Sequence, residues 1–121
     1  MRIRKVNLRD KLALFDTHWD PKIVGELNDQ HVKLVKLEGE FVWHSHEDED
    51  EMFLVLDGVL DIQFRDRVVT VEAGEFIIVP RGTEHRPVAE REAHVLLFEP
   101  ASTVNTGNMV SNRTVRDPER L

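Results

Sequence analysis

Two histidines separated by one residue, His44 and His46, are the side chains of this sequence best suited to chemistry. In extended backbone alternate side chains share a face, so both imidazoles would point the same way. A run of acids follows directly, from Glu47 to Glu51, and a third imidazole, His85, follows a Pro-Arg-Gly turn further along the chain. Three imidazoles and one carboxylate form a mixed nitrogen and oxygen donor set that suits Zn, Fe, Ni, Cu or Mn. The pattern therefore predicts a metal site.

Spacing alone leaves the identity of the carboxylate ligand open. Glu49, Asp50 and Glu51 all lie close enough along the chain to reach an ion held by the histidine pair. We favour Glu51 because it directly begins the apolar run Met52–Leu56, which would fix its backbone in a strand.

Glycines and a proline frame these residues in two extended patterns. The first is Gly39-x4-His44-x-His46-x4-Glu51-x6-Gly58, and the second is Gly74-x5-Pro80-x-Gly82-x2-His85. Together they resemble the two motifs of the cupin superfamily, G-x5-HxH-x3–4-E-x6-G and G-x5-PxG-x2-H-x3-N. The sequence departs from them at two positions outside the ligand set. Four residues, not five, separate Gly39 from His44, and Ala89 stands where the second motif ends in Asn.

This resemblance implies a small single-domain cupin with a jelly-roll β-barrel, also called a double-stranded β-helix. In that fold the two motifs lie on facing strands and a metal ion sits inside the barrel. The ligands that the resemblance implies for one divalent transition metal ion (Zn, Fe, Mn or Ni) are His44, His46, Glu51 and His85. It also implies a homodimer, and the β-rich N-terminal segment is compatible with pairing across a two-fold axis.

The hydrophobic pattern by itself predicts an all-β sandwich or barrel, because short strands alternate with turn signals at intervals of about ten residues. The expected strands span residues 22–27, 31–37, 41–46, 51–56, 59–64, 67–71, 76–79, 85–88 and 94–99. Residues 76–79 are apolar on both faces, so we expect a central, buried strand there. Before the strands, Asn7 is expected to cap a short helix over Leu8 to Phe15.

The chain of 121 residues is expected to form one domain. Residues 1–30 would form the N-terminal helix and first strand, residues 31–100 the barrel with both motifs, and residues 101–121 a polar C-terminal segment. Within that segment Thr103, Asn105 and Thr106 form either a cap over the barrel mouth or an ordinary surface loop. We expect the residues from Arg116 onward to be frayed.

Composition excludes several classes of partner. The net charge of −7 disfavours binding to nucleic acid and to anionic membranes, since both require a cationic surface. Cysteine is absent, which excludes disulfides and thiolate chemistry. The sequence has no apolar run long enough to span a bilayer and no apolar signal-peptide core near residue 1, so we expect a cytoplasmic protein.

Four polar or aromatic residues near the motifs have alternative interpretations. His31 is expected at the surface. His94 is either a structural histidine or a proton-transfer group in the pocket. Trp43 is expected in the core or at an interface in preference to stacking on a substrate. Gln63 faces either the pocket or solvent.

Three functions are compatible with such a site, because four protein ligands leave two positions open on a six-coordinate ion. The leading interpretation is an oxidoreductase, a dioxygenase-like enzyme acting on a small organic molecule such as an enol or catechol. The second is a sugar isomerase or lyase that uses the ion as a Lewis acid, and the third is a non-catalytic module that binds a metal or small ligand. An apolar pocket built from residues such as Phe53, Val55, Ile77 or Val79 would favour the first interpretation, and cationic pocket residues, for which Arg81 and Arg86 are candidates, would favour the second.

Overall fold

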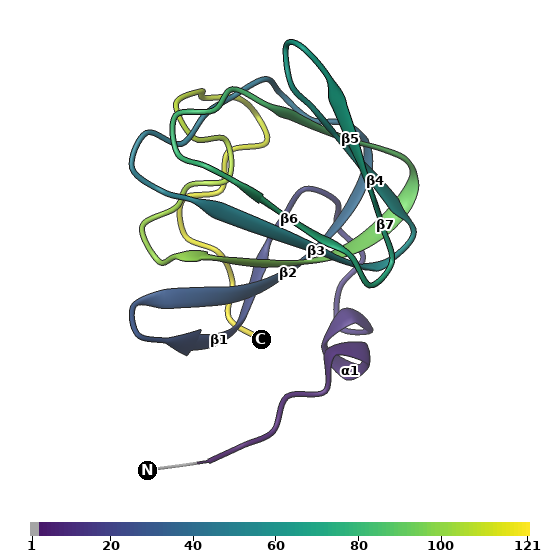
Figure 1. Cartoon of the computed structure of the whole chain (residues 1–121). Coiled ribbons are helices and arrows are strands. Elements are labelled where there is room, and N and C mark those ends of the chain that lie inside the picture. The colour runs from purple at the N-terminus through teal and green to yellow at the C-terminus, as the bar shows by residue number, and fades with distance from the viewer. Residues whose placement is uncertain (1–2) are drawn as a thin grey trace.

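The computed structural model describes residues 3–121 as seven antiparallel strands that curve around a single interior, with one short helix outside them (Figure 1). The elements are α1 (Leu8–Leu12), β1 (Lys22–Leu27), β2 (Gln30–Glu40), β3 (Glu51–Asp57), β4 (Val59–Gln63), β5 (Val68–Glu72), β6 (Phe76–Val79) and β7 (Arg86–Pro100). The strand order is β1-β2-β7-β3-β6, and β4 pairs with both β5 and β7. This arrangement is the jelly-roll type of all-β fold that the sequence predicted.

The N-terminal helix is present but shorter than expected. Asn7 caps it, because the side-chain oxygen accepts a hydrogen bond from the Asp10 N–H at 2.9 Å. The helix ends at Leu12 and not at Phe15. The Lys36 ammonium donates to the carbonyl oxygens of Leu12 and Phe15 at 2.8 and 2.6 Å, so a side chain from β2 satisfies carbonyl groups at and beyond the end of the helix.

A tight turn joins β1 to β2. Asn28 and Asp29 both have left-handed backbone conformations, with φ of 47° and 63°, which suit a two-residue hairpin turn. Strand β2 continues to Glu40 and pairs along its length with β7. The strands expected at residues 85–88 and 94–99 are one long strand, in which Ala89 and Ala93 pair with Gly39 and Leu37 of β2 on either side of a shift in register.

One strand assignment from the sequence is wrong. Residues 41–46 form no strand, and only an isolated bridge between His44 and His85 interrupts their irregular path. The register of β2 against β7 shifts between Leu37 and Gly39, where Gly39 has φ of 87°, and the regular ladder ends at Glu40, the partner of Val88. Beyond it only scattered backbone hydrogen bonds continue, from the Phe41 N–H to Pro87 and between His44 and His85.

Strand β6 is correctly located, but it is not central. It lies at the end of the sheet and pairs only with β3, and Phe76 and Ile78 have exposed fractions of 59% and 55%. Its outer face continues across β3, where Leu54 and Met52 are the partners of these two residues. Strand β6 is therefore apolar on both faces because one face packs toward the core and the other is an exposed apolar surface.

The core fills the space between the curved halves of the sheet. Its buried members are almost all aliphatic or aromatic, and they come from every strand except β1 together with residues 19 and 41: Trp19, Val35, Leu37, Phe41, Phe53, Val55, Leu60, Ile62, Val71, Val79, Ala89, Ala93, Val95 and Leu97. Within residues 3–121, no helix has the length and apolar character needed to span a membrane.

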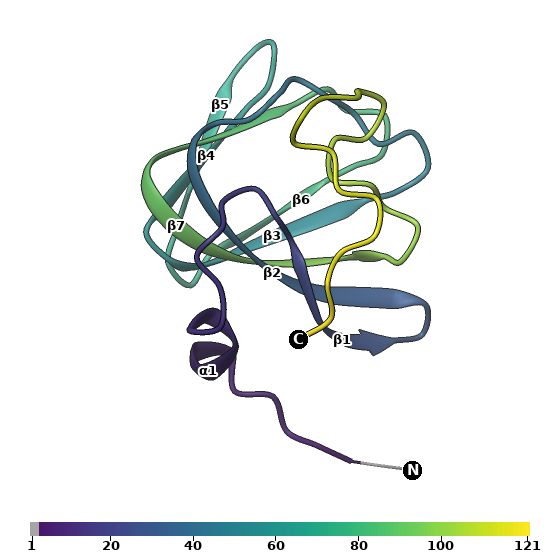
Figure 2. The same ribbon diagram turned by 180° about the vertical axis from the view of Figure 1, so that it is seen from behind.

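The C-terminal segment runs back along the barrel and ends beside β1, as the yellow trace in Figure 2 shows. Its last residues are held by backbone hydrogen bonds to Ile23, which donates to Glu119 at 2.8 Å and accepts from Leu121 at 3.0 Å. The expectation that the residues from Arg116 onward fray is therefore wrong. Main-chain pairing with an open strand edge holds them in place, and a polar sequence gives no sign of such pairing.

Candidate metal centre

Backbone hydrogen bonds join the two segments that carry the histidines. The N–H of His44 donates to the carbonyl oxygen of His85 at 3.0 Å, and the N–H of His85 donates back to His44 at 2.9 Å. The N–H of Gly82 donates to the carbonyl oxygen of His46 at 2.7 Å, with Gly82 at φ of 77° in the turn. Residues far apart in the sequence are in this way brought together at the mouth of the barrel.

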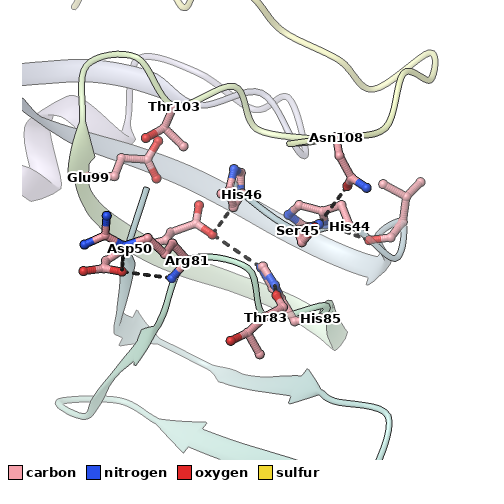
Figure 3. Close-up of polar contacts among 12 residues, drawn as sticks. His44, Ser45, His46, Asp50, Arg81, Thr83, His85, Glu99, Thr103 and Asn108 are labelled. Carbon is pink, nitrogen blue, oxygen red and sulfur yellow. Dashed lines mark hydrogen bonds and ion pairs between the residues drawn. The ribbon is translucent and has the colours of Figure 1, made fainter. Parts of the chain in front are cut away.

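The carboxylate in this group is Glu51. It begins β3, pairs with Val79 of β6 and is only 3% exposed. Its two sequence neighbours are engaged elsewhere, since Asp50 accepts a hydrogen bond from the Arg81 N–H and Glu49 accepts one from the Ser102 hydroxyl. Figure 3 shows Asp50 and Arg81 in contact, apart from the histidines.

Four donor atoms, one each from His44, His46, Glu51 and His85, lie within 4.8 Å of one another. The Glu51 Oε1 atom is 3.3 Å from His46 Nε2 and 3.4 Å from His85 Nε2. An ion that binds nitrogen and oxygen at about 2.1 Å holds neighbouring donors about 3 Å apart and opposite donors about 4.2 Å apart. The observed spacing fits one transition metal ion within the group.

The orientations of the imidazoles also fit a metal ion. His44 and His85 direct their Nδ1 atoms at the carbonyl oxygens of Val42 and Thr83, both at 2.9 Å. A carbonyl oxygen can only accept, so Nδ1 carries the proton in each ring and Nε2 keeps its lone pair for the cluster. His46 Nε2, His85 Nε2 and Glu51 Oε1 are buried with no hydrogen-bond partner among the described residues. Buried polar atoms usually have partners, and a shared ion would supply them.

The protonation states of the cluster suit metal binding as well. Burial, followed by the neighbouring His85 ring, lowers the pKa of His44 to about 4, so this imidazole is neutral at pH 7. Burial by itself would raise the pKa of Glu51, but contacts with His46 and His85 outweigh it and hold the pKa below its ordinary value. Neutral imidazoles and an ionised carboxylate are the forms that bind a metal.

The comparison with protein families agrees with this geometry. A family model described as the cupin domain matches residues 31–99, which is more than half of the chain and includes all four clustered residues. The chain belongs to the cupin family.

Individual relatives of this cupin include solved structures. A cupin-2 domain protein from Shewanella frigidimarina is 49% identical, with a TM-score of 0.78 over 78% of this chain and 93% of that one. Protein NMB1881 from Neisseria meningitidis is 31% identical, with a TM-score of 0.74 over 80% of this chain and 99% of that one. An uncharacterized Bacillus subtilis protein, YdbB, is 44% identical over 64 residues, which are 52% of this chain and 57% of YdbB. The chain thus spans just over half of that curated relative.

An apolar cavity of about 30 Å³ adjoins the cluster on the side of His44 and Glu51. Its remaining walls are mostly aromatic and aliphatic: Trp19, Pro21, Val35, Leu37, Phe41, Phe53, Pro87, Leu97 and Asn105. Of the pocket residues expected from the sequence, Phe53 lines this cavity. Val55 and Val79 are buried in the core, and Ile77 packs against it.

A buried ion pair lies near Glu51 in this cupin, and the sequence did not point to it. The Lys33 ammonium is 2.7 Å from Glu99 Oε2, and both residues are 2% exposed. Burial, followed by the nearby Glu51 carboxylate, raises the pKa of Glu99, while Lys33 opposes the rise. The only sequence signal was a charged residue at an inward position in each of two apolar strands.

The other polar residues singled out in the sequence lie outside the cluster. His31 is 7% exposed, which corrects the expectation of a surface position; its strand turns that side chain inward. His94 contacts Glu92 at 3.1 Å and is absent from the walls of the apolar cavity. The Trp43 ring lies against the Arg65 guanidinium at 3.8 Å, and Gln63 accepts a hydrogen bond from Arg86 at 2.9 Å.

Proposed function

We propose that this cupin is a metal-dependent oxidoreductase that transfers dioxygen to a small organic molecule. The observation that carries the proposal is the apolar cavity that borders His44 and Glu51. A divalent ion held by His44, His46, Glu51 and His85 would offer open coordination positions to a substrate and to dioxygen. The walls beside those positions would exclude water and favour an uncharged or weakly polar molecule.

The protein side chains have separate tasks in this scheme. The Val42 and Thr83 carbonyl oxygens fix the rings of His44 and His85, so two nitrogen donors keep one orientation throughout a reaction. Phe41 packs edge-on against His44, and Trp19 stacks on Phe41 with ring centroids 4.6 Å apart. These aromatic rings place a rigid apolar wall next to the donors, where it can orient a planar substrate.

Besides His44 and Glu51, the wall has two polar side chains: the Trp19 indole, whose N–H donates to the Glu38 carbonyl oxygen at 2.9 Å, and Asn105, whose amide is occupied at both ends. Its Oδ1 accepts from the Val115 N–H at 2.8 Å, and its Nδ2 donates to the Arg113 carbonyl oxygen at 2.7 Å. Substrate recognition would therefore depend on shape and on coordination to the ion. A small enol, catechol or diketone can bind an ion through oxygen, and the cavity of about 30 Å³ would take only part of such a molecule.

Lewis-acid chemistry on a sugar phosphate receives less support. The candidate cations, Arg81 and Arg86, do not line the apolar cavity. The Arg81 side chain is 66% exposed, and Arg86 binds Glu40 at 3.0 Å on the outside of the barrel. KdgF from a Halomonas species is 27% identical with a TM-score of 0.59 over 66% of this chain and 76% of that one, and its name indicates no substrate.

Oxygen uptake by the Fe(II)-loaded protein tests the proposal. Oxygen-electrode assays against a panel of enols and catechols should show substrate-dependent uptake that His85→Ala abolishes. Arg81→Ala is the matched control, because its side chain is exposed and lies outside the cavity. Stoichiometric iron binding without oxygen uptake for any member of the panel would contradict the oxidoreductase and leave the isomerase and the binding module.

A further inference from the structure

A second pocket borders the cluster and shares no lining residue with the apolar cavity. A pocket of about 240 Å³ is lined by ligand His46, by the acidic residues Glu47, Asp48 and Glu49, and by Ser102, Val104, Gly107 and Asn108 of the C-terminal segment. We refer to this pocket as the acidic mouth. The ligand His46 forms part of its wall, so the acidic mouth borders the metal centre directly.

Hydrogen bonds fix both rims of the acidic mouth. Glu49 accepts from the Ser102 hydroxyl at 2.8 Å, which ties the acidic loop to the C-terminal segment. On the other side the Asn108 side chain accepts from the Ser45 N–H at 2.8 Å, between two of the metal ligands. Glu47 and Asp48 are exposed and have no side-chain hydrogen bond or ion pair within residues 3–121. Their charges are therefore available to an incoming cation.

Unpartnered polar atoms continue from the acidic mouth toward the ligands. His46 is 3% exposed, and its Nδ1 atom has no hydrogen-bond partner among residues 3–121. Thr103, which lies between two residues of the mouth, has a buried Oγ1 atom without a partner, and so has Glu99 at Oε1. Figure 3 shows the Thr103 and Glu99 side chains close together on one side of His46. Buried oxygen atoms of Thr103 and Glu99 thus lie inside the barrel behind the acidic residues of the mouth.

The two sides of the cluster differ in the species that they can admit. The cavity beside His44 has walls of mostly aromatic and aliphatic side chains, which provide no ligands to replace the hydration shell of a cation. The acidic mouth offers carboxylate and hydroxyl oxygens, and its negative charge raises the local concentration of cations. Substrate and metal would consequently approach the same centre through separate openings.

We propose that the acidic mouth is the entrance through which divalent cations load the metal centre. Glu47 and Asp48 attract the hydrated ion, Glu49 and Thr103 provide oxygen atoms along its path, and His46 is the first ligand that it meets. This inference rests on the proposed metal centre and adds the route by which that centre is filled.

The rate of metal uptake tests the entrance independently of any enzyme activity. Apo protein would be mixed with Co²⁺ in a stopped-flow instrument, and the growth of the cobalt absorption bands would give the association rate constant. The test variant is Glu47→Gln/Asp48→Asn. The matched control, Asp57→Asn/Glu90→Gln, removes the same charge at exposed positions with no side-chain contact among residues 3–121, and Asp57 lies at the opposite end of β3 from Glu51.

We expect association to slow on the order of fivefold in the test variant at about 10 mM ionic strength, where screening extends over about 30 Å. The control should change less than about twofold, and the difference should largely disappear at about 1 M salt. Equal slowing in both variants, or no slowing in the test variant, would overturn the entrance while leaving the metal centre intact. A wild-type protein that binds no cobalt would overturn the metal centre and the entrance together.

Discussion

Replacement of Lys33 with methionine would break the buried ion pair that it forms with Glu99 near Glu51. The side chains of Lys33 and Glu99 are 2% and 1% exposed, with 2.7 Å between Nζ and Oε2. Methionine has a similar length but no charge, so Glu99 would lose its only basic ion-pair partner among residues 3–121. Removal of one member of a buried pair costs about 3–5 kcal/mol, because the other charge stays buried without compensation.

A decrease of this size in the free energy of unfolding is large for a domain of 121 residues. At about 4 °C for each kcal/mol, the melting temperature of the apo protein should fall by about 10–20 °C. The penalty should also depend on pH. Without Lys33 the pKa of Glu99, already raised by burial and by Glu51, rises further above its unfolded value. The folded state then holds a proton that the unfolded state releases, so the free energy of unfolding decreases as pH rises through the ordinary carboxyl range and above it.

Urea unfolding of the apo protein in the presence of chelator, at pH 5.5 and pH 8, measures both effects. Lys33→Met/Glu99→Leu removes both charges and should recover to within about 1 kcal/mol of the wild type. Lys22→Met is a control, because the partners of Lys22, Asp20 and Glu119, are 32% and 62% exposed. The reasoning would be refuted if Lys33→Met cost less than about 1 kcal/mol at pH 8, or if the double variant were as unstable as the single one.

Three further predictions concern pH, backbone and assembly. Burial, followed by the nearby Lys33 ammonium, lowers the pKa of His31. The stability that the neutral imidazole contributes is therefore lost as pH falls below about 6.5. His31→Gln should flatten the dependence of the unfolding free energy on pH between about 7.5 and 5.5. Gly107→Ala should destabilise the fold by on the order of 2 kcal/mol in thermal melts and weaken metal binding, because Gly107 has φ of 55° and an added Cβ would collide with Ser45, between His44 and His46. Gly74→Ala is the control: Gly74 has φ of 85° with open space around it, so this variant should show only the smaller backbone cost. We propose a homodimer that forms through the outer face of β6. Light scattering should then show the Ile78→Lys variant as a monomer and the Val68→Lys variant as a dimer, because Val68 lies on β5 and is as exposed as Ile78, at 55%. A monomeric wild type would contradict this.

The sequence was a good guide where local chemistry decides the structure. Asn7 caps the helix that the sequence predicted to follow it. The resemblance to the cupin motifs also identified the four clustered residues, and His85 pairs with His44 as that resemblance implied. In these cases a few neighbouring residues determine the backbone path.

The failures have a shared physical cause, which is that tertiary contacts decide burial. Lys33 lies next to Leu34 in a strand with apolar residues on both faces, so alternation alone did not show which side chains point inward. Phe76 and Ile78 looked like core residues because an apolar outer face has the same pattern as a buried one. The C-terminal residues are ordered by hydrogen bonds with Ile23, in which Ile23 donates to Glu119 and accepts from Leu121, and their own sequence does not encode this pairing.

Metal binding by purified protein tests the central claim most directly. Elemental analysis after purification without chelator or nickel resin, followed by titration of the apo protein, would compare the wild type with His44→Ala and His85→Ala. His94→Ala is the matched control, because this imidazole lies outside the cluster. We expect one transition metal ion for each wild-type and His94→Ala chain, and loss of stoichiometric binding in the other two variants. Full binding by His44→Ala or His85→Ala would remove that residue from the ligand set, and a wild type that binds no metal would contradict the metal centre itself.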